Sequence, residues 1–282
     1  MAVRIIIDSA ADIPPDEAAN LGMLHLPLGV VFGETEYADA VNLSHREFYE
    51  KLIESDVLPT TSQIPPSVFA DAYAQVVTAG DTAVVVTLSG ALSGTYQSAV
   101  IAAEDYADKV FVVDSRNVAI GERILILRGL ELREQGLDAA AIAAQLDEEK
   151  NDIRVLAMLD TLEYLKKGGR ISAATAVAGA LLSIKPVVAV EDGAVALIGK
   201  ARGSKQGNDL LRELILQCGG INFDKPCYLA YSGLSDARLQ KYVEDSADLW
   251  ASHTDALPVA TVGCTIGAHV GPGAVAVAFF KN

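Results

Sequence analysis

The order of elements in the first half of the chain constrains the fold more than any other feature of the sequence. Residues 82–88 form an unbroken run rich in valine and threonine, which is typical of a strand buried on both faces. A loop of small residues follows at 89–94, then a predicted helix over 95–107 and an apolar strand over 110–113. Because parallel strands require a crossover that packs on the sheet, this order predicts an α/β fold with a parallel sheet covered on both faces.

Periodicity and turn residues predict strands and helices along the rest of the chain. Ser44 and Glu47 have the spacing of a capping box and begin a helix that runs to about Glu54. Asp192-Gly193 lies between two apolar segments, a pattern typical of a hairpin. Further strands are expected at 3–7, 153–159, 187–190, 194–198, 227–231, 258–263 and 274–280, and further helices at 66–80, 119–134, 138–149, 161–167, 203–218 and 235–250.

The elements group into two α/β lobes, which we expect to be residues 1–160 and 161–282, with the chain free to cross between them. A glycine-rich turn over 267–273 is expected to join the last two strands. Residues 175–184 are apolar, rich in small side chains and without the charged stripe of a surface helix. This segment predicts either a core helix or a helix that lines a long apolar pocket.

Composition narrows the classes of function. Of the 282 residues 51% are hydrophobic, and 22 lysines and arginines face 37 acidic residues, a net charge of −15 that argues against nucleic acid as a partner. No signal peptide is recognisable and no apolar run approaches the ~18 residues of a membrane span, so a cytoplasmic location is expected. Cys218, Cys227 and Cys264 lack the spacing of a zinc site and no H-x-x-x-H pair occurs, so no metal is expected.

Motifs that carry catalysis or nucleotide binding are missing from the sequence. There is no P-loop and no G-x-G-x-x-G after a strand. Ser93 is not in a G-x-S-x-G nucleophile elbow, because Ala91 and Thr95 occupy the two glycine positions. The sequence therefore contains no complete set of catalytic residues, and none is assigned.

Four turns rich in hydroxyl groups or glycine lie at the predicted ends of strands and helices. They are residues 60–63, 89–95, 166–170 and the turn around His269. Hydroxyls and free N–H groups at a helix N-terminus form a site for an anion, although Ser93 alone is equally explained as a helix cap. The 89–95 loop follows a strand of the parallel sheet, where α/β folds bind ligands, which favours binding.

Charge is distributed unevenly along the chain. Residues 164–212 contain eight lysines and arginines against three acidic residues, a local charge of +5. This segment is either a solvated basic face or a surface for an anionic ligand or an acidic protein. Together, an anion site and an apolar interior indicate a carboxylate on a hydrocarbon tail.

Several motifs occur in order over the whole chain and resemble the DegV family. They are Asp8-Ser9 with Asp12, PTTSQ at 59–63, LSGTYQSA at 92–99, VDS at 113–115, TLEYLKKGGRIS at 161–172, LSIKP at 182–186 and HVGPG at 269–273. The resemblance implies two α/β lobes with a tunnel for a long-chain fatty acid. Characterised members of the family are subunits of bacterial fatty acid kinase, which present the fatty-acid carboxylate to a separate ATP-using subunit for acyl-phosphate formation.

The same resemblance implies roles for individual residues. Thr61 and Ser93 would bind the carboxylate, with Ser62 and Gly94 adjacent and His269 near the head group. Such a carrier needs no cofactor besides its bound fatty acid.

Three basic residues are also assigned by the resemblance. Arg170 would support the head group electrostatically, and Arg202 with Lys200 would form the docking surface for the kinase subunit. A role in phospholipid metabolism also allows a transient contact with a membrane surface.

Two other functions fit part of the sequence. One is a hydrolase or acyltransferase that uses Ser93 with His269, although no third member of a triad is identified. The other is a binder of a phosphorylated small molecule that uses Arg170, Lys166 and Lys167. Retention of a fatty acid by the purified protein would separate both from the lipid carrier.

Overall fold

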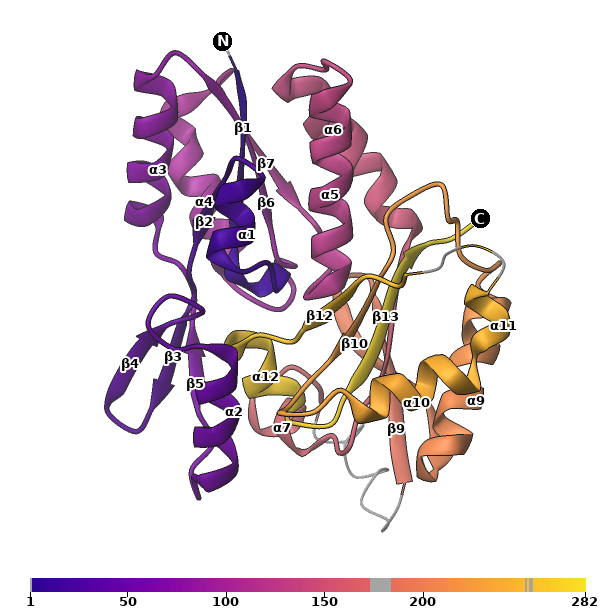
Figure 1. The fold of residues 1–282 in the computed structure, drawn as a ribbon. Helices are drawn as coiled ribbons and strands as arrows, with labels where there is room; N and C mark the ends of the chain where they lie inside the picture. The colour runs from indigo at the N-terminus through magenta and orange to yellow at the C-terminus, as the bar shows by residue number, and fades with distance from the viewer. Residues whose placement is uncertain (1, 173–183, 252, 254–255) are drawn as a thin grey trace.

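The computed structural model describes residues 2–172, 184–251, 253 and 256–282, and it has the α/β architecture that the sequence predicts (Figure 1). The apolar run over 175–184 lies outside the described residues except for Ile184. Within the described ranges, no helix combines the length and the apolar character that crossing a membrane requires.

The first sheet contains the parallel strands predicted from the sequence. Its strands are β1 Val3–Asp8, β2 Met23–Leu26, β6 Thr82–Thr87 and β7 Val110–Asp114, and the helices around it are α1 Pro15–Asn20, α3 Pro66–Thr78, α4 Thr95–Ala103, α5 Ile120–Glu134 and α6 Ala139–Glu149. The order is β2-β1-β6-β7, and every pair is parallel. Helices α3 and α4 cover one face and α5 and α6 the other (Figure 1), so β6 is buried at every position.

The second sheet is mixed and has the order β10-β9-β8-β13-β11-β12. Its strands are β8 Ile153–Met158, β9 Ile184–Glu191, β10 Ala194–Arg202, β11 Tyr228–Tyr231, β12 Val259–Thr261 and β13 Val275–Phe280. The same half of the chain contains the helices α9 Gly203–Gln217, α10 Ala237–Asp245 and α11 Ala247–Trp250. The predicted hairpin at Asp192-Gly193 is confirmed, since it joins antiparallel β9 and β10. Both residues have positive φ, 49° and 80°, as a tight turn of this type requires.

A third, small sheet was not predicted. It has the order β4-β3-β5, with β3 Gly29–Phe32, β4 Thr35–Ala38 and β5 Thr60–Ser62. Helix α2 His45–Glu54 lies between β4 and β5 in the sequence. These strands are only three or four residues long, too short for alternation to be recognised. The capping box of α2 is confirmed, because Ser44 and Glu47 hydrogen-bond each other's backbone N–H groups.

Two predictions about the second half are wrong. The segment expected as a glycine-rich turn instead contains a helix, α12 Cys264–Val270, and His269 lies on it. The carboxylate of Asp39 accepts hydrogen bonds from the N–H groups of Cys264 and Thr265, a distant contact that stabilises this start. The single helix expected over 235–250 is interrupted at Ser246, whose hydroxyl bonds to the carbonyl of Tyr242.

Helix α5 packs between the first and second sheets, with contacts to β1 and β6 on one side and to β8, β11 and β13 on the other. One hydrophobic core therefore continues from Ile5 and Val84 of the first sheet to Val155 and Phe280 of the second. The strand β8 pairs with β9 and β13, although it precedes residue 160. The division of lobes at residue 160 remains a prediction.

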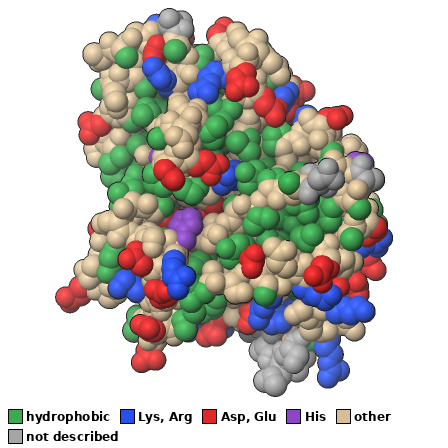
Figure 2. All heavy atoms as spheres, in the orientation of Figure 1, with side chains coloured by type: hydrophobic (Ala, Val, Ile, Leu, Met, Phe, Trp, Pro, Cys, Tyr) green, Lys and Arg blue, Asp and Glu red, His purple; other side chains and the backbone are tan. Residues whose placement is uncertain are grey.

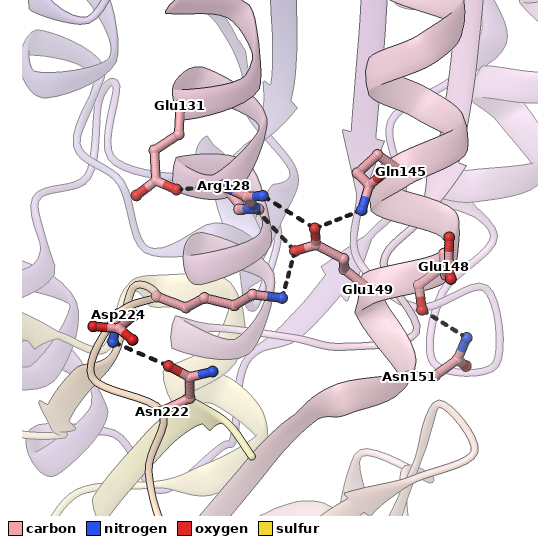
Figure 3. Close-up of polar contacts among 9 residues, drawn as sticks. Arg128, Glu131, Gln145, Glu148, Glu149, Asn151, Asn222 and Asp224 are labelled. Atoms are coloured by element: carbon pink, nitrogen blue, oxygen red, sulfur yellow. Dashed lines mark hydrogen bonds and ion pairs between the residues drawn. The ribbon is translucent and has the colours of Figure 1, made fainter. Parts of the chain in front are cut away.

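A buried ionic network joins α5 and α6 to the loop before β11 (Figure 3). Glu149, whose side chain is 7% exposed, accepts hydrogen bonds from Arg128 at 2.9 and 3.2 Å, from Lys225 at 3.0 Å and from Gln145 at 2.8 Å. Burial alone would raise the pKa of Glu149, but these bonds hold it below its ordinary value. Glu149 is therefore an anion in the folded protein, and its hydrogen bonds connect α5 and α6 to the loop before β11.

Replacing Glu149 with alanine is expected to lower the free energy of unfolding by about 2 kcal/mol. Arg128 and Lys225 would lose their shared partner; removing one member of a buried pair costs roughly 3–5 kcal/mol, and their partial exposure reduces this. Thermal unfolding should show a fall in Tm of roughly 5 °C. Glu148→Ala is the matched control, because Glu148 is exposed on the same helix. Equal Tm values for the two variants would contradict a role of this network in stability.

Candidate functional site

A cavity of about 170 Å³ lies where β5, the loop before α4, α12 and the segment after α7 Glu163–Lys167 meet. Strand β5 and helices α12 and α7, far apart in sequence, lie next to one another in the lower half of Figure 1. Its polar lining contains Thr61, Ser62, Gln63, Ser93, Gly94, Arg170, Thr265 and His269. The structure therefore brings together every residue that the sequence assigned to the head group.

Thr61 and His269 form a direct contact across the cavity wall. Thr61 lies on β5, paired with Val30 of β3, and its Oγ1 is 2.9 Å from Nε2 of His269 on α12. Burial, together with the nearby Arg170 guanidinium, lowers the pKa of His269 to about 4. His269 is therefore neutral at pH 7, and it can exchange a hydrogen bond with the threonine hydroxyl in either direction.

Gly168 makes room for His269. A Cβ at this position would lie 2.2 Å from Nδ1 of the imidazole, which is closer than real Cβ atoms approach. Arg170 is tied to the same turn, because its Nη1 donates to the carbonyl of Gly168 at 2.6 Å. The KKGGR turn thus positions both an arginine and a histidine at the cavity.

Arg170 also connects this turn to the loop before α4, residues 89–94 (the serine loop), since its Nε donates to the carbonyl of Leu92 at 3.1 Å. Both of these acceptors are neutral carbonyls, and no carboxylate of the described residues pairs with it. With His269 neutral, Arg170 is the one fully charged cation among the described residues of the cavity lining.

The serine loop has both a local and a cavity-facing role. The Ser93 hydroxyl accepts a hydrogen bond from the N–H of Thr95 at 3.2 Å and lies 3.0 Å from the Thr95 hydroxyl, so it does stabilise the start of α4. The adjacent Gly94 is in close contact with Gln63, whose Oε1 would be 2.0 Å from a Cβ on Gly94. The Ser62 hydroxyl donates to Glu36 at 3.1 Å, so it is engaged at the outer edge of the cavity.

Sequence reasoning did not assign a role to Thr265. Its side chain is 3% exposed, lines the cavity and has an Oγ1 without a hydrogen-bond partner among the described residues. Thr265 precedes His269 by four residues, which places both on one face of α12. This spacing would have been informative if the segment had been recognised as a helix.

A second, apolar cavity of about 70 Å³ adjoins the first. Five residues line both: Val118, Leu165, Val195, Ile266 and Val270. The remaining lining is entirely apolar and includes Ala157, Ala230, Ala274 and Ala276. Small side chains thus border an apolar space that adjoins the polar cavity and lies against β8, β9, β11 and β13 of the second sheet.

The geometry does not favour the two competing functions. Ser93 and His269 are not hydrogen-bonded to each other, because the serine contacts Thr95 and the imidazole contacts Thr61. The pair therefore lacks the nucleophile–base contact of an activated serine.

The lysines proposed for a phosphate do not converge on the cavity either. Lys166 and Lys167 are exposed and absent from its lining, and Lys167 pairs with Glu163 at 2.9 Å. Of the three cations in that hypothesis, Arg170 alone lines the cavity.

The two residues expected to dock a kinase lie on the surface, at the end of β10. Lys200 and Arg202 are exposed and separated by the buried Ala201, so they share one face of the strand. Figure 2 shows lysine and arginine side chains gathered at the lower right of the face drawn, interspersed with acidic ones. Within the described chain, no acidic side chain pairs with Arg202, whereas Arg212 pairs with Asp248.

Known proteins similar to this chain share both its sequence and its fold. A DegV domain-containing protein of Deinococcus radiodurans is 35% identical over 282 residues, which cover 99% of this chain and 98% of the relative. The structure of a DegV family protein from Thermus thermophilus, described under the heading of fatty acid binding, superposes on this chain with a TM-score of 0.88 at 30% identity and full coverage of both chains. DegV of Bacillus subtilis, described as a fatty acid binding protein, has a TM-score of 0.84 at 29% identity, also with full coverage of both.

The family assignment extends over nearly the whole sequence. The sequence model of the family described as "Uncharacterised protein, DegV family" matches residues 2–282. The match includes all the segments that form the cavity and both larger sheets. The chain belongs to the DegV family.

Proposed function

We propose that this protein binds a long-chain fatty acid and presents its carboxylate to a separate kinase subunit. The observation that carries the first part is the arrangement of the two cavities. A polar cavity with one charged arginine adjoins a space lined by apolar side chains alone. The description of similar DegV structures as fatty acid binding supports the same ligand class.

The head group would be the carboxylate. Burying a carboxylate is costly unless it is hydrogen-bonded and its charge is balanced. Thr61, Ser93 and the Gly94 loop offer hydrogen-bond donors, with Ser62 adjacent, His269 orients Thr61, and Arg170 supplies the positive charge. These groups would fix the orientation of the ligand.

The tail would supply most of the affinity. At ~0.8 kcal/mol for each buried CH₂, a tail of about 16 carbons contributes on the order of 10 kcal/mol before ordering costs. The lining of the adjoining cavity, which includes Val118 and Ile266, is apolar and therefore suited to an aliphatic tail. Because such a lining makes few directional contacts, it selects an aliphatic chain more than a particular pattern of unsaturation.

The direct test is to identify what the protein carries. Protein purified from a bacterial host should yield one long-chain fatty acid per chain in native mass spectrometry and in organic extracts. Delipidated protein should gain thermal stability when palmitate or oleate is added. Absence of any extractable fatty acid, combined with no thermal shift, would contradict the proposal.

Arg202→Glu is expected to impair phosphorylation of the bound fatty acid while leaving lipid binding unchanged. Arg202 is exposed within the segment of local charge +5, where a positive side chain would steer an acidic partner. Acyl-phosphate formation, measured against carrier concentration with the kinase subunit and ATP, should require roughly tenfold more of the variant at low salt, and the difference should shrink at high salt.

The matched control for this charge reversal is Arg46→Glu. Arg46 is also exposed but lies on α2, outside the basic segment. Curves that coincide for wild type and Arg202→Glu would exclude this docking residue, and a loss of lipid binding in Arg202→Glu would assign it to the pocket instead.

A further inference from the structure

Three side chains from distant parts of the chain bring metal-binding atoms together outside the fatty-acid cavity. Asp39 follows β4, His45 is the first residue of α2 and Cys264 is the first residue of α12. A carboxylate oxygen, an imidazole nitrogen and the thiol sulfur of these residues all lie within 4.8 Å of one another. We propose that Asp39, His45 and Cys264 bind a divalent transition metal ion of the zinc class.

The donor set fits that class of ion. Zinc binds thiolate, imidazole and carboxylate ligands, and three protein ligands with one open position are a common arrangement. The hard cations magnesium and calcium use oxygen ligands instead, so the cysteine and the histidine argue against them. A thiolate and a carboxylate together balance the two positive charges of the ion.

The charge of the surroundings also favours a cation. Asp39 is 1% exposed and Asp12 is 3% exposed, and in the described part of the chain no lysine or arginine pairs with Asp39. Asp12 borders the cluster, since a Cβ on Gly263 would be 2.9 Å from both Asp12 Oδ1 and His45 Nε2. Oδ2 of Asp12 has no hydrogen-bond partner within the described residues. A divalent ion would compensate the negative charge of the buried Asp39 carboxylate.

Hydrogen bonds hold the Asp39 ligand in place. Asp39 accepts hydrogen bonds from the N–H groups of Cys264 and Thr265 and from the hydroxyl of Ser9, at 3.1–3.2 Å, which orients its carboxylate. Cys264 is fully buried, whereas His45 is half-buried. The absence of any zinc motif in the sequence follows from the separation of the ligands, since Asp39 and Cys264 are 225 positions apart.

Metal binding is tested with zinc and cobalt alone, without lipid, so the result is independent of the proposed fatty-acid function. The full chain, reduced and stripped with a chelator, should bind one equivalent of zinc in a calorimetric titration. Cobalt(II) should give a thiolate-to-cobalt charge-transfer band, which reports a sulfur ligand directly. Cys264→Ser and His45→Gln should each weaken zinc binding by at least ~100-fold.

The other two cysteines provide the matched control. Cys218 and Cys227 are half-buried elsewhere, so the double variant Cys218→Ser/Cys227→Ser leaves Cys264 as the sole thiol and should retain both the zinc affinity and the cobalt band. This variant tests the proposal even if Cys264→Ser fails to fold. The proposal is overturned if wild type binds no stoichiometric zinc, if the cobalt band disappears in the double variant, or if His45→Gln binds zinc as tightly as wild type.

Discussion

Replacing Arg170 with glutamine is expected to weaken binding of palmitate by roughly 100-fold, the largest effect of any single change at the cavity. Arg170 is the one full positive charge among the described lining residues, because His269 is neutral at pH 7. Removing one partner of a desolvated charge pair costs roughly 2–5 kcal/mol, and about 2.7 kcal/mol corresponds to 100-fold. Glutamine retains an N–H donor for the carbonyls of Leu92 and Gly168, so the turn should keep its shape.

An uncharged ligand separates an electrostatic role of Arg170 from a structural one. Wild type should prefer palmitate to methyl palmitate, because only the free acid carries a charge that Arg170 can balance. In Arg170→Gln this preference should largely disappear, while the affinity for the ester changes little. Equal losses for acid and ester would show that Arg170 only maintains the shape of the pocket.

Lys166→Gln is the matched control, since it removes the same charge four residues earlier. Lys166 is exposed and does not line the cavity, so its loss should leave palmitate affinity within about twofold, as for a screened surface charge. Thr61→Val should have an intermediate effect of roughly tenfold, because it removes one hydroxyl and its contact with His269. An unchanged affinity in both Arg170→Gln and Thr61→Val would mean that the head group binds elsewhere.

The parts of the fold that the sequence predicted are encoded within a few neighbouring residues. Strand β6 is a continuous β-branched run, the turn at Asp192-Gly193 needs two residues with positive φ, and Ser44 finds its capping partner three residues later. In each case the stabilising contact is local, so a pattern of a few residues is sufficient to identify it.

The helix α12 was missed because its stabilising contacts are distant. The N–H groups at its start bond to Asp39, 225 residues away, and Gly263 bonds to Asp12, 251 residues away. Local propensity in a segment rich in glycine points to a turn, and tertiary contacts override it. The same error concealed Thr265, whose position relative to His269 is recognisable only on a helix.

The residues of the candidate site were assigned through the resemblance of the sequence to the DegV family. No regular spacing along the chain connects them. Thr61 and His269 are in contact although they are 208 positions apart in sequence. The short strand β5, which positions Thr61, has no periodic signal of its own, and it exists because it pairs with β3. A site assembled from such segments is visible in sequence only through several short motifs in a fixed order.

Raising the pH from about 5 to about 8 is expected to lower the free energy of unfolding substantially, through two buried carboxyl groups. Asp8 ends β1 and Glu122 lies in the first turn of α5, and both are fully buried. Burial is the main cause that raises the pKa of Asp8 to about 7, against the N–H groups of Leu88 and Ala10, which lower it. Burial, and then the nearby Asp8, also raise the pKa of Glu122 well above its ordinary value.

The sign of the effect follows from proton binding. Between the ordinary carboxyl pKa and these raised values, the folded protein holds protons that the unfolded chain has released. The contribution to stability is therefore complete below about pH 4 and is lost as the pH rises through about 7. For Asp8 alone, the loss between pH 5 and pH 8 is about 3 kcal/mol, because each unit of pKa shift is worth about 1.4 kcal/mol.

Glu122→Gln should make this pH dependence shallower by about 1.4 kcal/mol per pH unit, the contribution of one proton. Glutamine occupies nearly the same volume, carries no charge and can donate an N–H to Asp8, so the variant should be more stable than wild type at pH 8 and similar to it near pH 5. Denaturant unfolding across this range, in metal-free buffer, measures the slope. Glu134→Gln, an exposed residue at the end of the same helix, is the matched control and should reproduce the wild-type slope. If Glu122→Gln also follows the wild-type slope, Glu122 does not hold an extra proton in the folded protein.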